Sequence, residues 1–142
     1  MLFREYTITK IFQGRLSKGS DLIEDIMAFL KEKDIHSGII SGIGAASKAT
    51  IGYYDQVNRI YKTKTFEEPL EILSIKGNIS IKDHDVFPHI HGVFSRQDGS
   101  CIGGHVFGGT EVFAFEFEII EFSGDAFIRC FDDETGLYLW AK

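Results

Sequence analysis

The chain has 142 residues, of which 44% are hydrophobic and 25% charged, so it has the length and composition of one globular domain, which we expect to cover residues 1–142. Its net charge of −6 argues against a broad phosphate-binding surface, and no apolar run approaches the ~20 residues that span a membrane. Two cysteines are too few for a disulfide framework, and the N-terminus lacks a signal pattern. We therefore expect a cytoplasmic protein with reduced thiols.

The first expected elements are a strand and a helix. Residues 6–12 alternate polar and apolar side chains, which favours a strand. A helix is expected from about Ser20 to Lys33, with Ser20 as the N-cap residue. Its buried stripe is predicted from apolar residues at three- and four-residue spacing, namely Leu22, Ile26, Phe29 and Leu30.

The remainder of the chain has the pattern of strands separated by turns. Residues 37–44 and 48–54 are expected to form two strands joined by Ala45-Ala46-Ser47. Further strands are expected over residues 60–66, 71–81, 86–94, 101–107, 111–122 and 127–131. Alternation in the seventh of these eight segments predicts one face with Phe113, Phe115, Phe117 and Ile119, and the opposite face with Glu116 and Glu118.

Three histidines in this strand-rich part have the spacing of a metal site. His89 and His91 are two residues apart, and His105 follows fourteen residues after His91. Alternate residues of a strand project from one face, roughly 6–7 Å apart. An imidazole from a neighbouring strand, about 5 Å away, can complete a triangle. Three neutral imidazoles suit Zn²⁺ and other first-row ions, so the spacing predicts a metal site; unrelated surface or core histidines are the alternative.

The turn between these strands decides whether the three histidines converge. A two-residue turn at Asp98-Gly99 would place His105 opposite Gly92, on the face away from the other two histidines. Convergence within one chain therefore needs a three-residue loop, or a bulge for which Gly103-Gly104 is suitable. Alternatively, a neighbouring subunit supplies His105.

Other residues are candidates for supporting the metal. Cys101 is a candidate fourth ligand, although a small buried apolar residue is the simpler interpretation. An open fourth position would instead permit hydrolase or lyase chemistry, with Glu116 or Glu118 as the general acid or base and Glu71 as second choice. The two remaining histidines are interpreted as a helix-end and a loop residue, His36 and His84.

Several ordered motifs resemble the prokaryotic branch of the plant and prokaryote conserved (PPC) domain family. They are Arg15-Leu16-x-x-Gly19-x-Asp21-Leu22, Gly42-Ile43-Gly44-Ala45, Glu71-Ile72-Leu73-Ser74-Ile75-x-Gly77-Asn78-Ile79-Ser80, His89-x-His91-x-x-x-Ser95, Asp98-Gly99, Gly103-Gly104-His105 and Thr135-Gly136-Leu137. The resemblance covers nearly the whole chain. It implies an α+β fold, in which a mainly antiparallel sheet of about seven strands is flanked by helices, and a homotrimer. It also implies one zinc ion per subunit, bound by His89, His91 and His105.

The resemblance also raises the question of DNA association. Plant members carry a basic AT-hook segment ahead of the domain, and this acidic sequence has none. Direct DNA contact would need a local cationic patch, for which the candidates are Arg4, Lys10, Arg15, Lys18, Lys48, Arg59, Lys62 and Lys64. We therefore expect a homotrimeric zinc-binding module with protein partners on its surface, and direct DNA contact is disfavoured. The alternative is a zinc-dependent hydrolase or lyase acting on a small molecule.

Overall fold

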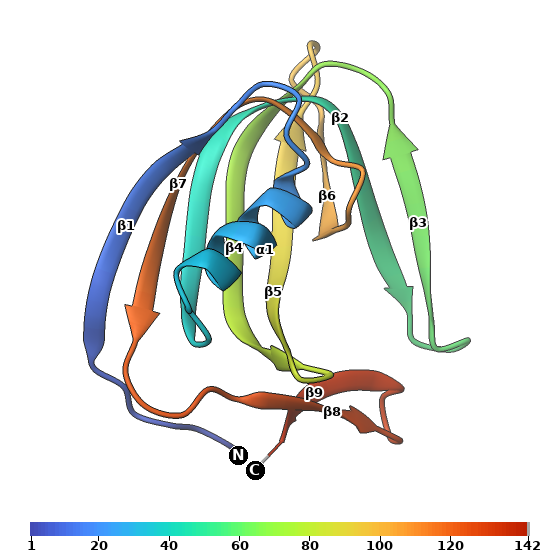
Figure 1. The fold of residues 1–142 in the computed structure, drawn as a ribbon. Coiled ribbons are helices and arrows are strands. Elements are labelled where there is room, and N and C mark those ends of the chain that lie inside the picture. The colour runs from blue at the N-terminus through green and yellow to red at the C-terminus, as the bar shows by residue number, and fades with distance from the viewer. Residues whose placement is uncertain (142) are drawn as a thin grey trace.

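The computed structural model describes residues 1–141, which form one helix and nine strands of a single sheet. In chain order the elements are β1 (Ile8–Leu16), α1 (Leu22–Glu32), β2 (Gly38–Asp55), β3 (Ile60–Phe66), β4 (Leu70–Lys82), β5 (Asp85–Ser95), β6 (Cys101–Val106), β7 (Glu111–Phe122), β8 (Ile128–Asp132) and β9 (Leu137–Ala141). The strands follow the order β1-β7-β2-β6-β5-β4-β8-β9, β3 pairs with β2, and β2 also pairs with β4 (Figure 1).

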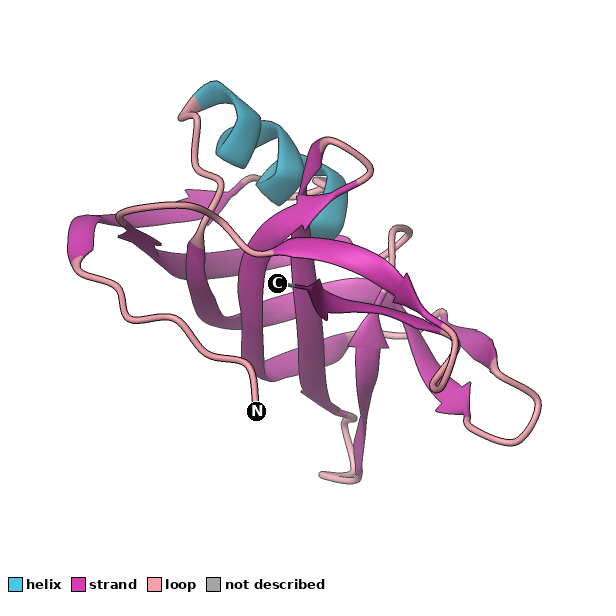
Figure 2. Cartoon of the chain, turned by 90° about the horizontal axis from the view of Figure 1, so that it is seen from below, coloured by secondary structure: helices cyan, strands magenta, loops and turns pink. Residues whose placement is uncertain are grey.

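The expected α+β fold, with about seven strands and flanking helices, is wrong. Within residues 1–141, α1 is the only helix, and it lies on one side of the sheet (Figure 2). The flanking helices were implied by the resemblance, whereas the side-chain pattern after residue 33 is one of alternation and short apolar runs, which favours strands. The strand β9 (Leu137–Ala141), which pairs with β8 as a C-terminal hairpin, was not expected.

The helix α1 fills the curve of the sheet with its apolar stripe. Leu22, Ile26 and Leu30 are fully buried. Asp21, rather than Ser20, is the N-cap residue, since its carboxylate accepts hydrogen bonds from the first free amides of the helix. Within residues 1–141, α1 is too short to cross a membrane.

The strand β2 is continuous where two strands were expected. Its 18 residues run through Ala45-Ala46-Ser47, where the pairing with β7 shifts register twice. Such bulges bend a strand without ending it. As a result, the first half of β2 pairs with β4 and β7, and the second half pairs with β3 and β6.

At the same irregularity, the side chain of Phe113 on β7 is exposed to solvent instead of buried. Phe115, Phe117 and Ile119 are buried as expected, but Phe113 is 54% exposed. The register with β2 shifts between the pairs Ala45–Ala114 and Ala46–Val112. The expectation that Phe113 shares the buried face is therefore wrong, because a bulge breaks the two-residue period at this point.

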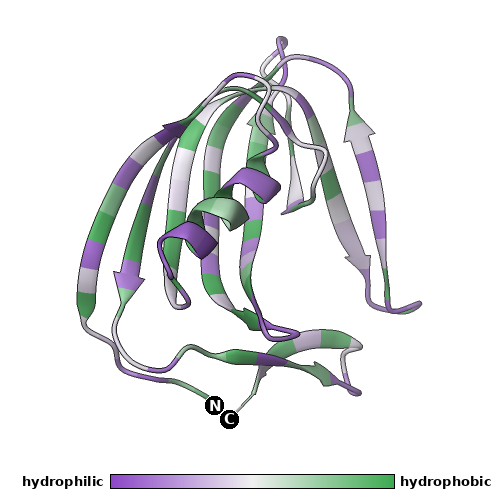
Figure 3. Ribbon diagram, in the orientation of Figure 1, coloured by the Kyte–Doolittle hydropathy of each residue, from purple (hydrophilic) through white to green (hydrophobic). Residues whose placement is uncertain are grey.

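Alternation along β5 defines the two faces of the sheet. Ile90 and Phe94 are fully buried in the core that includes α1, and we call this the inner face. His89 and His91 alternate with the buried residues and therefore project from the opposite, outer face. Figure 3 shows the alternating bands of hydrophobic and hydrophilic residues along the strands.

Candidate metal centre

The strands β5 and β6 bring the three predicted histidines together. His91 and His105 are paired directly across the two strands, and His89 lies one pleat further along β5. The ring centroid of His89 lies 5.1 Å from that of His91 and 5.0 Å from that of His105. The centroids of His91 and His105 are 5.3 Å apart. One nitrogen of each ring lies within 4.8 Å of the other two. Three imidazole donors thus converge on one point of the outer face.

A three-residue turn produces this convergence. The Arg96 amide donates to the Ser100 carbonyl, and the Gly99 amide donates to the Arg96 carbonyl, each over 2.9 Å. Residues 97–99 therefore form the turn, with Gly99 in the left-handed region at φ +81°. The pairing continues without a register shift to His105. The three-residue loop is confirmed, the two-residue turn is excluded, and neither a bulge nor a second subunit is needed.

The surroundings of His89 and His105 favour the neutral form of both rings. Burial lowers the pKa of His89 to about 4, helped by the positive charge of Arg129 and by the neighbouring histidines. Burial also lowers the pKa of His105 to about 4, with smaller effects from His91 and Arg129. A neutral imidazole keeps a free lone pair at neutral pH, which is the form that binds metals.

One ring nitrogen of the cluster has no partner. His105 Nδ1 is buried and accepts or donates no hydrogen bond to any atom of residues 1–141. Leaving such an atom unsatisfied costs roughly 1–3 kcal/mol, so native structures rarely do so without a reason. A converging set of neutral imidazoles with an orphaned nitrogen has the chemistry that a transition-metal ion requires. The residues therefore fit the metal that the family resemblance implies.

Arg129, on β8, is a site residue that the sequence analysis missed. Its side chain is buried, and its Nη2 lies 3.3 Å from His89 Nδ1. Three of its N–H groups donate to Ser80 Oγ at 2.8 Å, Asn78 Oδ1 at 2.7 Å and the Tyr138 carbonyl at 3.0 Å. Its only signal in the sequence is a lone charge in the stretch Ala-Phe-Ile-Arg-Cys-Phe.

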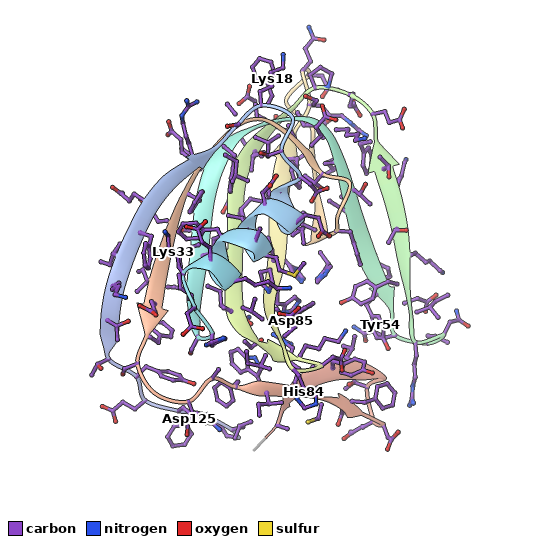
Figure 4. The ribbon with its side chains drawn as sticks, viewed as in Figure 1. Lys18, Lys33, Tyr54, His84, Asp85 and Asp125 are labelled. Atoms are coloured by element: carbon purple, nitrogen blue, oxygen red, sulfur yellow. The ribbon has the colours of Figure 1, made fainter. Side chains whose placement is uncertain are left out.

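A cavity of about 420 Å³ opens beside the histidines. His89 and His105 line it together with three cationic side chains, Arg59, Lys82 and Arg129. Hairpin β2–β3 and hairpin β8–β9 supply much of the wall, and the Tyr54 hydroxyl links them by donating to the Thr135 carbonyl at 2.7 Å. Figure 4 labels Tyr54 near the end of β2, above β8 and β9. No Asp or Glu of the described residues lines this cavity.

The expected helpers of the metal lie elsewhere. Glu118 accepts hydrogen bonds from Gln13 and Ser41, on strands β1 and β2, and Glu116 lines the same hollow. Cys101 is exposed rather than buried and is paired with Ser95 beside the turn, about 13 Å along β6 from His105. Glu71 is likewise paired with Ser95. None of these side chains belongs to the three-histidine cluster of residues 1–141.

The other two histidines lie in the local structures that were expected. His36 follows α1 and lies 3.5 Å from the carboxylate of Asp34. His84 lies with Asp83 in the two-residue turn between β4 and β5, where both residues have positive φ. This geometry is that of a type I′ hairpin turn.

The comparisons with known proteins agree with the motifs. The profile of the Plants and Prokaryotes Conserved (PCC) domain family matches residues 3–123. The chain belongs to this family. It is the PPC family that the motifs resemble, and the matched range includes all three histidines of the cluster.

Solved structures of similar proteins share the fold over all or nearly all of their length. A metal-containing protein from Archaeoglobus fulgidus is 48% identical, with a TM-score of 0.96 and coverage of 100% of both chains. A PPC protein from Pyrococcus horikoshii is 30% identical, with a TM-score of 0.93 and coverage of 100% of this chain and 98% of that one. A "putative DNA binding protein" from Bacteroides thetaiotaomicron is 30% identical, with a TM-score of 0.85 and coverage of 96% of each. No curated protein matches the sequence.

Proposed function

We propose that this PCC domain is a metal-binding module in which His89, His91 and His105 hold one zinc ion per subunit. The observation that carries the proposal is the convergence of three imidazole nitrogens within 4.8 Å of one another. The unsatisfied Nδ1 of His105 and the lowered pKa values of His89 and His105 support it. The 48% identical A. fulgidus protein, which contains a metal, supports it further.

Zinc is the ion that suits these donors best. Imidazole nitrogens bind zinc readily, and the cluster contains no carboxylate or thiolate that would favour Mg²⁺, Ca²⁺ or an iron–sulfur cluster. When bound, zinc supplies a Lewis acid that polarises a ligand or lowers the pKa of water. The chain's own residues contribute neutral donors on a rigid two-stranded ladder.

A second candidate function is small-molecule chemistry at this site, as a hydrolase or lyase. The cavity of about 420 Å³ beside the histidines favours it, because three protein donors leave room for a further ligand. The carboxylates expected to act as general acid or base, Glu116 and Glu118, line a different hollow. For this reason the binding module remains our first choice.

We also propose that the domain assembles as a homotrimer. The outer face carries an apolar patch of four exposed side chains, which we call the outer apolar patch: Ile43, Leu73, Val93 and Phe113. Ile43, Leu73 and Phe113 line one shallow hollow, and Val93 is paired with Ser74, next to Leu73. Contiguous exposed apolar side chains of this kind are typical of subunit interfaces. Val93 is two residues from His91, so the interface would lie close to the metal centre.

Direct DNA contact is not part of the proposal. Several candidate cations face acidic partners: Lys62 lies 2.6 Å from the Asp55 carboxylate, and Lys10 and Lys48 each lie 4.0 Å from a glutamate. Arg15 is paired with Glu116 across β1 and β7. DNA binding gains affinity when protein cations neutralise phosphates and release counterions from the DNA. A chain with a net charge of −6, whose cations already face acidic residues, has few cations free for this. Protein partners on the trimer surface fit this surface better.

The thiols agree with a cytoplasmic location, which we propose as well. Cys101 and Cys130 are exposed and form no disulfide. Exposed free thiols persist in reducing compartments and are readily oxidised elsewhere.

Elemental analysis tests the metal proposal. Protein purified without chelators from zinc-replete medium should contain about one zinc per chain, whereas His91→Ala should lose it. His84→Ala is the matched control, because His84 lies in the β4–β5 turn outside the cluster, and it should retain the metal. Zinc absorption spectroscopy would then identify nitrogen ligands. A wild-type protein that stays free of metal would refute the proposal.

A further inference from the structure

We propose that the cavity beside the three histidines binds a small organic carboxylate, with Arg129 as its charged anchor. The carboxylate would be the ligand of the proposed metal site. Only the contact between ligand and metal rests on the proposed function, because the positive charge of the cavity comes from the chain's own side chains.

Among residues 1–141, no carboxylate provides a counter-charge for Arg129. Its side chain is 7% exposed, yet no carboxylate oxygen of residues 1–141 lies within 4.0 Å of it. Three of its five N–H groups donate to neutral acceptors on Ser80, Asn78 and Tyr138, and Nη2 also lies 3.3 Å from His89 Nδ1. These neutral groups carry no charge that compensates the guanidinium within residues 1–141, and a buried charge without a partner is costly. One N–H on Nη1 remains for an anion, and guanidinium groups suit carboxylates.

Two further cations reinforce the positive field of the cavity. Lys82 Nζ lies 4.2 Å from the centre of the Tyr138 ring, and Arg59 donates to the Asp133 carbonyl at 2.8 Å. Neither forms an ion pair within 4.0 Å in the described part of the chain, and no acidic residue lines the cavity. The cavity is therefore positive in a chain whose net charge is −6. A divalent metal on neutral imidazoles would add to this excess, so an anion is the ligand that balances the site.

The walls define the rest of the ligand. Phe87, Phe107 and Tyr138 provide apolar ring surface, and the Tyr61 ring lies 5.2 Å from that of His105. The volume falls at the lower end of the 300–1,000 Å³ that is usual for small-molecule sites. One anchoring guanidinium, apolar walls and a small volume together fit a monocarboxylate with a compact apolar body.

Distant parts of the chain are held together around this cavity. Asn78 and Ser80, which fix Arg129, belong to one family motif, and Gly136 belongs to another. A Cβ at Gly136 would lie 2.8 Å from the Tyr54 hydroxyl and 3.2 Å from Arg59, so the β8–β9 turn packs closely against the β2–β3 hairpin.

Arg129 could have a purely structural role, in which it only joins β8 to β4 and needs no anion, and the experiment must separate the two roles.

Benzoate and its uncharged analogue benzamide separate them, because they differ mainly in charge. Each is titrated into ¹⁵N-labelled protein, both metal-free and zinc-loaded, while the backbone amides and the Arg129 Nε–H signal are followed by NMR. Wild type should bind benzoate about tenfold more tightly than benzamide, as expected for one charge-assisted hydrogen bond. Arg129→Gln should abolish that preference. Arg96→Gln, which removes a cation paired with Glu68 outside the cavity, should leave it unchanged.

A folding control and a second variant ensure that the titrations can contradict the proposal. Melting curves check that Arg129→Gln is folded; if it is not, Lys82→Gln replaces it and should weaken benzoate severalfold without affecting benzamide. Failure of wild type to prefer benzoate would overturn the inference. So would a preference that needs zinc and survives Arg129→Gln, because the carboxylate would then be held by the metal alone. Zinc content, measured on the same samples, reports separately on the metal proposal.

Discussion

His91 lies directly opposite His105 in the ladder between β5 and β6. Directly opposed residues share a face, so this one pairing places both imidazoles on the outer face with His89. The pairing follows from the length of the turn that connects the strands. A turn one residue shorter, with the pairing shifted accordingly, would send His105 to the inner face. The proposed metal centre therefore depends on turn geometry as much as on the histidines themselves.

Replacing Gly99 tests the contribution of the turn to stability. Gly99 has φ +81°, and a Cβ built there would meet no atom within 4 Å, so Gly99→Ala adds backbone strain without a clash. We expect Gly99→Ala to lower the free energy of unfolding by about 1 kcal/mol, measured by urea denaturation. Gly108→Ala is the control, because Gly108 lies outside the left-handed region and its Cβ would meet only Glu24 at 3.5 Å. Equal effects in both variants would contradict this explanation.

Zinc should stabilise the folded protein. A ligand that binds only the native state adds about 2.7 kcal/mol to the free energy of unfolding when its free concentration is about 100 times Kd. We expect the melting temperature of the wild type to rise when zinc is added to chelator-treated protein. His91→Ala should melt at the same temperature with and without zinc, whereas His84→Ala should respond like the wild type. A zinc response retained by His91→Ala would mean that the ion binds elsewhere.

The metal-free protein should lose stability in mild acid. The pKa values of His89 and His105 are lowered to about 4 in the folded protein, from the ordinary 6.5. Between these values the unfolded chain binds more protons than the native state, so acid favours unfolding. The contribution is fully present above pH 6.5 and is lost as the pH falls towards 4. Urea denaturation with chelator at several pH values measures it. His105→Leu should show a shallower pH dependence than wild type, and an identical slope would count against the shifted pKa.

A charge on the outer apolar patch should dissociate the proposed trimer. Leu73 is 50% exposed and lies in the patch, so Leu73→Glu would bury an unpaired carboxylate at the interface. We expect light scattering to give about three times 16.0 kDa for wild type and close to 16.0 kDa for Leu73→Glu. Val57→Glu is the control, because Val57 is 90% exposed in the β2–β3 turn. A wild-type protein that is monomeric at all concentrations would refute the trimer.

Local patterns were sufficient for most of the helix and strand positions and for choosing the three histidines of the proposed metal site. The helix expected over residues 20–33 is found at Leu22–Glu32, because its apolar spacing and acidic start are local properties. The strand containing His89 and His91 was likewise expected over 86–94 and found over Asp85–Ser95. In contrast, the position of Phe113 was predicted wrongly, because a bulge depends on the partner strand and leaves no sign in the period of β7 itself.

The sequence by itself determined which residues can donate to a metal and that two of them share a strand face, since both follow from residue type and the two-residue period of a strand. Only the tertiary structure decided that His105 joins them, that Glu116 and Glu118 do not, and that Arg129 approaches His89 from a strand forty residues further along the chain. Those outcomes depend on strand order and register. They are set by the packing of the whole sheet, and a local pattern contains no information about which distant strand will lie beside it.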